Sequence, residues 1–290
     1  MKFGVREICD VVFKAKAETK IGNTTFPAGA PVLYIDSAKT STIEGAATTV
    51  YATGGRGNTR LIAWEGEKTL TFTVEDALLS PMGFAILSGA GLLKGAESEK
   101  VHVHTTAQAY ASNGTIDLTD ALTTDEEICG DAPIYVLPVA ADGSLDGEPK
   151  PGTAQGKTIT ATGVTGNVFV DFYVSKKSST VSELQIDAAN FAGYYYVEAS
   201  TLFRRQDTGV DMPAEITFPN VKIQSNFTFA MASSGDPSTF TFTMDAFPGY
   251  TAFNTKRKVL CAIQIVEDAI NENAAIETVF PCDHTDAAEG

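Results

Sequence analysis

Residues 235–249 read GDPSTFTFTMDAFPG, and threonine alternates with an apolar residue over positions 239–244. Residues 68–81, KTLTFTVEDALLSP, repeat this alternation. Successive side chains of a β-strand point to opposite faces of a sheet, so each stretch predicts a strand with one apolar face and one threonine face. The side chains expected to face a core are Leu70, Phe72, Val74, Phe240, Phe242 and Met244.

The threonine face of each predicted strand is polar, and three surroundings suit it. It can meet bulk solvent, a neighbouring subunit or the bore of an assembly. Two strands of this kind indicate either a pseudo-repeated half-sandwich or two strands that line one surface. The threonines concerned are Thr69, Thr71, Thr73, Thr239, Thr241 and Thr243.

Composition places the chain among folded, mainly β proteins. It has 290 residues, of which 43% are hydrophobic and 20% charged, and this length suits one large domain or two of ordinary size. Threonine accounts for 35 residues, and β-branched residues favour strands. The net charge of −15 argues against a conventional nucleic-acid-binding protein, whose affinity rests on Lys and Arg. An acidic wall does suit a surface that DNA passes without binding, because it repels phosphates.

The cysteines and the N-terminal residues predict a cytoplasmic protein. The four cysteines are dispersed and form no CxxC pair, so we expect free thiols in a reducing compartment. Charges at Lys2, Arg6, Glu7 and Asp10 leave no room for the apolar core of a secretory signal. The cysteines are Cys9, Cys129, Cys261 and Cys282.

Residues 77–93 form an uncharged stretch, ALLSPMGFAILSGAGLL. It falls short of the roughly 20 apolar residues that a membrane span needs. Ser80 is a suitable N-cap, Pro81 suits the first helical position, and residues Gly89 to Gly91 would end a helix. The stretch therefore predicts a short, almost wholly buried helix.

The spacing of strands and turns predicts a discontinuous chain organisation. Residues 1–99 and 189–290 are expected to form one β core, and residues 100–188 an inserted small Ig-like β-sandwich domain. Residues 37–60 are small, polar and rich in glycine, which predicts a long loop or arm. Two hairpins are expected in the second half, one turning at QDTGVDM and one at SSGDP.

The histidines offer weak candidates for chemistry. His102 and His104 would point to one face of a strand, a spacing that can hold a metal, but a third ligand would have to come from far away. Exposed cross-strand residues are the better interpretation. His284 lies in the acidic stretch CDHTD, which we interpret as a solvated terminus.

Two further stretches invite a binding interpretation. Residues 53–60, TGGRGNTR, suggest a phosphate cradle, but the P-loop ending is missing, and a flexible arm is the better interpretation. Trp64 with Tyr194–Tyr196 could form a sugar platform, although a tyrosine run is more often a sheet or subunit contact. The sequence has no nucleophile elbow, zincin motif or dinucleotide fingerprint, and no pair of carboxylates stands out for glycoside hydrolysis. We therefore expect no enzyme, no metal and no cofactor.

Residues 54–93 together with residues 221–249 resemble virion structural proteins of tailed bacteriophages, and are most similar to tail tube (major tail) proteins. The resemblance implies a β-sandwich with one flanking helix that assembles with itself into hexameric rings. The rings would stack into a tube through which DNA is ejected without specific binding, and long loops would bridge subunits. It also implies a place in the virion tail, assembly in the host cytoplasm, and contacts with a sheath protein and with baseplate or terminator proteins.

The resemblance covers residues 1–95 and 190–268 and leaves residues 100–188 uncovered, so these would be an added domain on the outer face of a tube. The alternative is another virion component, such as a baseplate, capsid-decorating or host-attachment protein, whose inserted sandwich binds a partner or a glycan. A cell-surface or enzymatic β protein is a third possibility. If the chain forms a tube, we expect at least one of the two threonine-faced strands to turn its threonines toward the bore.

Overall fold

A computed structural model describes residues 2–266 apart from 23, 94–99, 125, 178–180, 187, 230, 232 and 235–237. Strands dominate the described residues, which confirms the predicted mainly β class. The chain divides into two compact units, residues 1–91 with 186–290, and residues 92–185. That the second unit is an inserted Ig-like domain stays a prediction.

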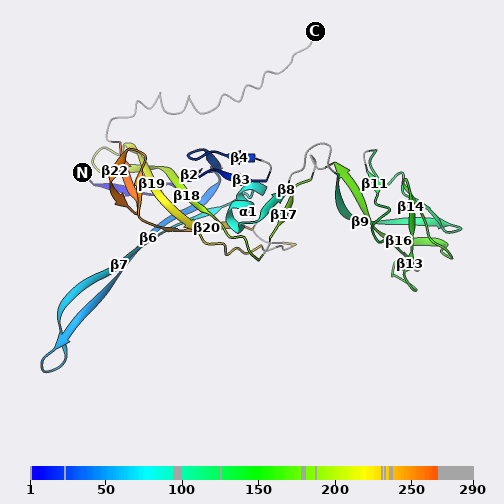
Figure 1. Cartoon of the computed structure of the whole chain (residues 1–290), viewed down its shortest axis with the longest axis horizontal. Helices are drawn as coiled ribbons and strands as arrows, with labels where there is room; N and C mark the ends of the chain where they lie inside the picture. Colours follow the sequence, from blue (N-terminus) through cyan, green and yellow to red (C-terminus); the bar gives the residue numbers. More distant parts are fainter. Residues whose placement is uncertain are drawn as a thin grey trace, which may run out of the picture. The chain divides into compact units, whose positions relative to one another are not determined.

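The first unit is built on a nine-stranded antiparallel sheet (Figure 1). Its order is β5-β2-β18-β19-β20-β7-β6, with β1 pairing with β18 and β23 pairing with β19. The two threonine-faced strands, β7 and β20, are therefore neighbours. The strands are β1 (Phe3–Val5), β2 (Asp10–Ala15), β5 (Pro31–Ile35), β6 (Ala38–Gly54), β7 (Thr59–Asp76), β18 (Tyr194–Arg205), β19 (Asp211–Ile223), β20 (Phe240–Ala246) and β23 (Ala262–Ile265).

One face of this sheet carries the core of the first unit. Phe72 of β7 stacks on Phe218 of β19 with ring centroids 4.7 Å apart, and both rings are fully buried. Of the six apolar side chains predicted to face a core, five are buried, and Leu70 is partly buried against the same cluster. The alternation read from the two strands is thus confirmed. Full burial of each such side chain stabilises the fold by about 1.5–3 kcal/mol.

The predicted helix is present as α1 (Pro81–Ser88), shorter than the apolar stretch that suggested it. The Ser80 hydroxyl accepts a hydrogen bond from the Gly83 amide at 2.9 Å, and Pro81 occupies the first turn. The helix ends at Gly89, whose φ is 72° and where a Cβ would lie 2.4 Å from the carbonyl carbon of Phe191. Residues 83–88 are buried. No helix among the described residues is both long and apolar enough to cross a membrane.

Of the two hairpins predicted in the second half, one is confirmed and one is wrong. β18 and β19 pair around the expected turn. There the Arg204 guanidinium forms a bidentate ion pair with the Asp211 carboxylate, with both N–O distances at 2.6 Å. The described residues between β19 and β20 contain no strand, and β20 pairs with β19 and β7 instead. Phe227 and Phe229 pack edge-on against Phe84 of α1, so their alternation reflects packing over the helix. The expected turn lies partly outside the described residues.

The expected loop or arm at residues 37–60 is mostly strand. β6 begins at Ala38 and pairs along its length with β7, and the two are joined by a turn at residues 55–58. Positive φ angles at Gly55, Gly57 and Asn58 close this turn. The result is a long two-stranded hairpin that extends away from the rest of its sheet (Figure 1).

Two smaller hairpins complete the first unit. β3 (Thr19–Ile21) pairs with β4 (Thr24–Phe26), and β21 (Gly249–Thr251) pairs with β22 (Asn254–Val259). In the β21–β22 hairpin, the backbone amide of Ala252 donates a hydrogen bond to the Tyr196 hydroxyl at 3.2 Å. This bond holds the hairpin against the face of the sheet opposite its core.

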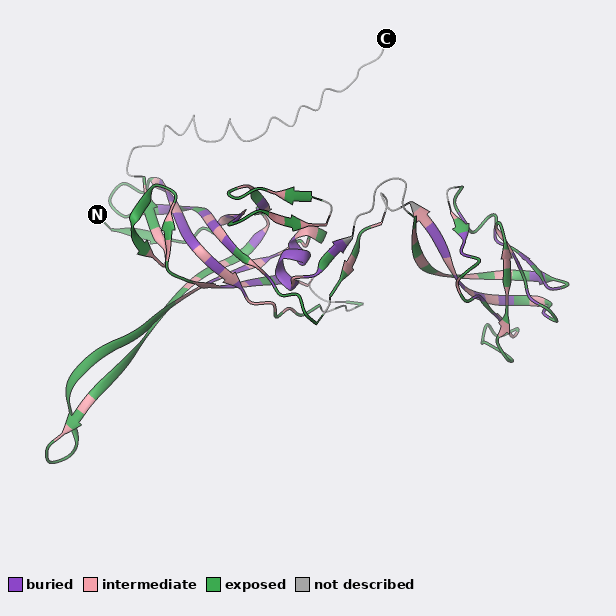
Figure 2. Cartoon of the chain, viewed as in Figure 1, coloured by how far each residue is buried: buried purple, intermediate pink, exposed green. Residues whose placement is uncertain are grey.

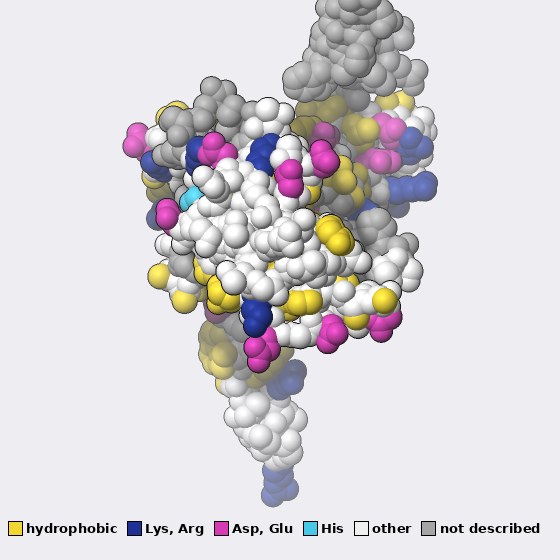
Figure 3. Space-filling model, turned by 90° about the vertical axis from the view of Figure 1, so that its right-hand side faces the viewer, with side chains coloured by type: hydrophobic (Ala, Val, Ile, Leu, Met, Phe, Trp, Pro, Cys, Tyr) yellow, Lys and Arg dark blue, Asp and Glu magenta, His cyan; other side chains and the backbone are white. Residues whose placement is uncertain are grey.

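The second unit has its own eight-stranded sheet and its own core of mainly β-branched residues. β8 (Gly91–Leu93) and β17 (Glu183–Gln185), where the chain enters and leaves this unit, pair with each other. The sheet strands are β9 (Lys100–Ser112), β10 (Thr115–Asp117), β11 (Glu127–Ile128), β12 (Tyr135–Pro138), β13 (Lys150–Pro151), β14 (Thr153–Gln155), β15 (Thr158–Thr160) and β16 (Gly166–Lys177). On the face of this unit that Figure 3 presents, acidic and basic side chains are interspersed.

Candidate functional site: the threonine face and the β6–β7 hairpin

The structure brings the predicted threonines onto one face of two adjacent strands, β7 and β20, and threonines of β6 extend this face. Thr73 of β7 lies directly opposite Thr243 of β20 and, on its other side, opposite Thr42 of β6. The row next to it contains Glu75 opposite Thr241. The sequence left open a pseudo-repeated half-sandwich or two strands that line one surface, and the structure has the second arrangement. We call this surface the threonine face; its members are Thr40, Thr42, Glu44, Thr69, Thr71, Thr73, Glu75, Thr239, Thr241, Thr243 and Asp245.

Carboxylates and hydroxyls pair across the threonine face. Thr71 donates a hydrogen bond to Asp245 at 3.2 Å, and Thr40 donates to Glu75 at the same distance. Thr239 donates to the other oxygen of Glu75. The hydrogen bond from Thr239, followed by that from Thr40, lowers the pKa of Glu75. This carboxylate is therefore ionised at neutral pH, and it adds negative charge to a face rich in hydroxyls.

The threonine face is open to its surroundings in the single chain. Thr69 and Thr241 are exposed, and the other four predicted threonines are half-buried among their neighbours. Cations lie at the edges of the face: Lys222 of β19 is opposite Asp245, and the charge of Lys39 contributes to the lowered pKa of Glu75. That the face lines a bore stays a proposal.

Beyond the threonine face, the β6–β7 hairpin continues without a third strand among the described residues. A bulge interrupts its register between Ala47 and Thr49. There the Thr48 hydroxyl accepts a hydrogen bond from the Glu67 amide at 2.9 Å, and a Cβ on Gly66 would lie 2.5 Å from the same oxygen. A larger residue at 66 would displace the Thr48 hydroxyl from this hydrogen bond. We call the part beyond the bulge, residues 49–64, the distal hairpin.

The distal hairpin is largely exposed (Figure 2), and several of its exposed residues are apolar. Val50 lies opposite Trp64, and Ala52 lies opposite Ile62, so one face of the ribbon is apolar. Exposed fractions are 63% for Val50, 53% for Trp64 and 55% for Ile62. A two-stranded ribbon is at best marginally stable alone, and an exposed apolar face of this kind marks an interaction site.

Sequence reasoning missed the distal hairpin. Its first strand mixes threonine, alanine and glycine with Val50 and Tyr51 and shows no clear alternation, and the only useful signal was the apolar run Leu61, Ile62 and Trp64 after the glycine turn. The suspected phosphate cradle at residues 53–60 is this turn and its flanks, where the Arg60 guanidinium lies 4.0 Å from the centre of the Tyr51 ring.

The suspected sugar platform does not form one surface. Trp64 belongs to the distal hairpin, whereas Tyr195 is buried against Phe13 in the core. Burial raises the pKa of Tyr195 to about 12. Tyr194 stacks edge-on with Phe247 at 5.8 Å.

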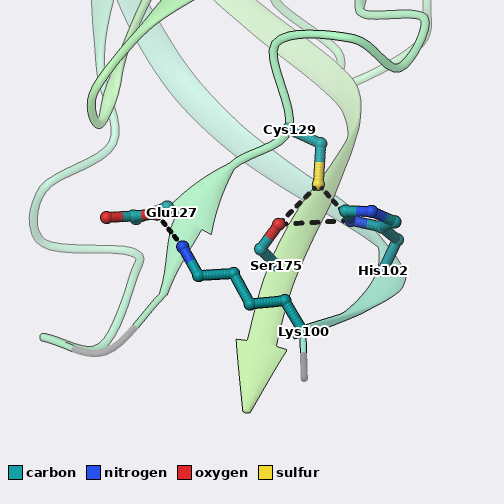
Figure 4. Close-up of polar contacts among 5 residues, drawn as sticks. All are labelled: Lys100, His102, Glu127, Cys129 and Ser175. Atoms are coloured by element: carbon teal, nitrogen blue, oxygen red, sulfur yellow. Dashed lines mark hydrogen bonds and ion pairs between the residues drawn. The ribbon is translucent and has the colours of Figure 1, made fainter. Parts of the chain in front are cut away.

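The histidines have local partners in the second unit. His104 pairs with Asp171 at 2.9 Å, and His102 contacts Cys129 and Ser175 (Figure 4). Within the described part of the chain, no group of three or more His, Cys, Asp or Glu side chains could hold a metal ion. Cys9, Cys129 and Cys261 are free thiols, while Cys282 and His284 lie outside the described residues.

Comparison with known proteins gives one family. Residues 4–258 match the YomU/Tube protein family. The match extends across both units, and so beyond the two segments on which the sequence resemblance rested. A search of curated proteins finds no match.

Proposed function

Because the chain belongs to the YomU/Tube protein family, a phage-derived family of tube proteins, we propose that its copies stack as hexameric rings to form a phage tail tube. The family is one of structural proteins, and the proposed role needs no catalytic group. In this proposal the second unit is an added domain that leaves the bore open.

The observation that carries the proposal is the distal hairpin. Its apolar face has no cover among the described residues, and it belongs to a strand pair that extends from the edge of a nine-stranded sheet. Among the described residues β6 pairs with no strand other than β7, so its outer edge can pair with another chain. When the hairpin lies on a neighbouring copy, its apolar face is buried and the outer edge of β6 can pair with that copy. Several buried apolar side chains at about 1.5–3 kcal/mol each would stabilise every such contact.

The threonine face is suited to line the conduit. A wall that DNA passes must be wet, poor in cations and free of apolar patches that would trap bases. Hydroxyls of threonine and carboxylates such as Glu75 and Asp245 meet these needs, and salt screens their repulsion of phosphate over about 10 Å at 0.1 M. The opposite face of the same strands packs the core, so the strands can serve both roles.

The remaining parts of the proposal follow from the tail tube role. DNA would leave the virion through the bore during ejection, and the ends and outside of the tube would meet terminator, baseplate and sheath proteins. Assembly would take place in the host cytoplasm, and the finished protein would reside in the virion tail.

The first test is the assembly state of the purified full chain. Size-exclusion chromatography with light scattering gives its mass over a range of concentrations, and negative-stain microscopy gives its shape. We expect rings or tubes with a central channel. A chain that stays monomeric at every concentration, at low and at physiological salt, would contradict the proposal.

A further inference from the structure

Three polar side chains of the second unit, His102, Cys129 and Ser175, meet beside its sheet (Figure 4). His102 of β9 and Ser175 of β16 are direct cross-strand partners, and Cys129 follows β11, which pairs with the same part of β16. The Cys129 Sγ lies 2.8 Å from the His102 Nδ1 and 3.1 Å from the Ser175 Oγ. The Ser175 Oγ lies 3.1 Å from the same Nδ1, which closes a triangle.

We propose that Cys129 is a nucleophilic thiol that small disulfides modify, with His102 as its base. In this arrangement the thiol proton moves from Sγ to Nδ1, leaving a thiolate beside an imidazolium. The thiolate then accepts hydrogen bonds from the Nδ1–H of His102 and from the Ser175 hydroxyl. A sulfur within hydrogen-bond reach of a base, with a further group that orients the pair, is the arrangement that activates cysteine nucleophiles.

The distances favour proton transfer over metal binding. Zinc holds sulfur at about 2.3 Å and imidazole nitrogen at about 2.0–2.1 Å, so two tetrahedral ligands lie about 3.5 Å apart. The separation of 2.8 Å between the Cys129 Sγ and the His102 Nδ1 is too short for two ligands of one zinc ion, and it places the thiol and the imidazole in direct contact.

The other described cysteines lack this arrangement. Burial raises the pKa of the Cys9 thiol, and it raises that of Cys261 to about 11. Cys9 has hydroxyl neighbours, Ser41 and Thr201. In the described contacts neither thiol meets an imidazole, so both serve as controls within the same chain.

The cluster lies close to the surface. Cys129 and Ser175 are 8% and 9% exposed, but His102 and the next residue in the chain, Gly130, are exposed. A small displacement of the loop after β11 would therefore open the sulfur to a small reagent.

The charges around the cluster are mostly paired. On β9 and β11, Lys100 pairs with Glu127; on β16, Lys176 pairs with Glu126 at 2.7 Å. The exposed Asp131 follows Cys129 by two residues. The base nearest the sulfur is thus the His102 imidazole.

The covalent step is thiol–disulfide exchange. The Cys129 thiolate attacks one sulfur of a low-molecular-weight disulfide, and a new S–S bond forms as the old one breaks. The leaving thiolate takes the proton held by the His102 imidazolium. The disulfide is the oxidant, and the product is a mixed disulfide on Cys129 with one released thiol.

The test is peptide-resolved mass spectrometry of the folded full chain after short exposure to iodoacetamide and, separately, to oxidised glutathione. We expect Cys129 to react faster than Cys9 and Cys261 at pH 7. His102→Ala should slow both reactions at Cys129 by about tenfold, because an unassisted thiol is only a few per cent thiolate at pH 7. His104→Ala is the matched control, since His104 is on the same strand but contacts Asp171, and it should leave the rate unchanged.

A second measurement separates activation of the Cys129 thiol by His102 from access of the reagent to the sulfur. At pH 10 an ordinary thiol is ionised without help, so the wild type and His102→Ala should alkylate at similar rates there. The inference is overturned if Cys129 reacts no faster than the two control cysteines. It is equally overturned if His102→Ala matches the wild type at pH 7, or if the two differ as much at pH 10 as at pH 7.

Discussion

Replacing Trp64 by alanine should weaken assembly without weakening the fold. The indole is 53% exposed and lies opposite Val50 in the distal hairpin, outside both cores. A large aromatic side chain can bury about 150–250 Å², so roughly 100 Å² of Trp64 is available to a partner. At about 25 cal/mol per Å², its loss costs about 2.5 kcal/mol per contact, or roughly 60-fold in the association constant.

The assay is light scattering over a concentration series of the wild type, Trp64→Ala and a control, with thermal unfolding recorded for each. Leu145→Ala is the control, since Leu145 is 56% exposed but belongs to the second unit. We expect the midpoint concentration of assembly to rise for Trp64→Ala alone, while the unfolding temperature of the unassembled chain stays near that of the wild type. An unchanged midpoint would refute the role given to the distal hairpin, and so would an equal rise for Leu145→Ala.

Three further predictions concern the fold and the threonine face. Replacing residues 100–188 with a short Gly/Ser linker should still allow assembly. The pairing of β8 with β17 shows that the chain enters and leaves the second unit at neighbouring points, which a short linker can span even though the variant lacks β17; a remainder that fails to fold in circular dichroism would contradict this. Phe72→Ala removes a ring stacked on Phe218 and should lower the free energy of unfolding in urea by about 3–5 kcal/mol; a loss below 1 kcal/mol would mean that the ring is not a core residue in solution. The pKa of Glu75 is lowered in the folded protein, so the stability that this carboxylate contributes is present above its unfolded pKa and is lost as the pH falls through its folded pKa. Because the hydrogen bond from Thr239 is the main cause of the lowered pKa, Thr239→Val should raise the pKa of Glu75 in an NMR titration. An unchanged titration would show that this hydrogen bond does not form.

Sequence reasoning succeeded where a single face of an element is buried. Phe72 and Phe242 alternate with threonines because one side of their strands packs a core, and this leaves a period of two in the sequence. The helix was found from its ends, since Ser80 and Gly89 have the roles that their residue types favour.

Sequence reasoning failed where the local pattern of residues does not reveal what the segment packs against in the folded chain. Residues 226–232 alternate like a strand, yet Phe227 and Phe229 cover a helix. The first strand of the distal hairpin has both faces in solvent, so its sequence shows no alternation of apolar and polar residues. The pairing of Thr73 with Thr243 joins positions far apart in the chain, which no local pattern reveals.

The Cys129 cluster could not be predicted for the same reason. Its cysteine, histidine and serine come from three different strands or their ends, and only the sheet register brings them together. In the sequence His102 stood out for its spacing to His104, but the structure gives the two histidines different partners.

The most direct test of the central claim is an electron cryo-microscopy map of the assembled particle. We expect stacked rings with a central channel, Thr73 and Thr243 of each copy facing that channel, and Trp64 buried against a neighbouring copy. A particle without a channel, or one in which the whole threonine face lies away from it, would contradict the account.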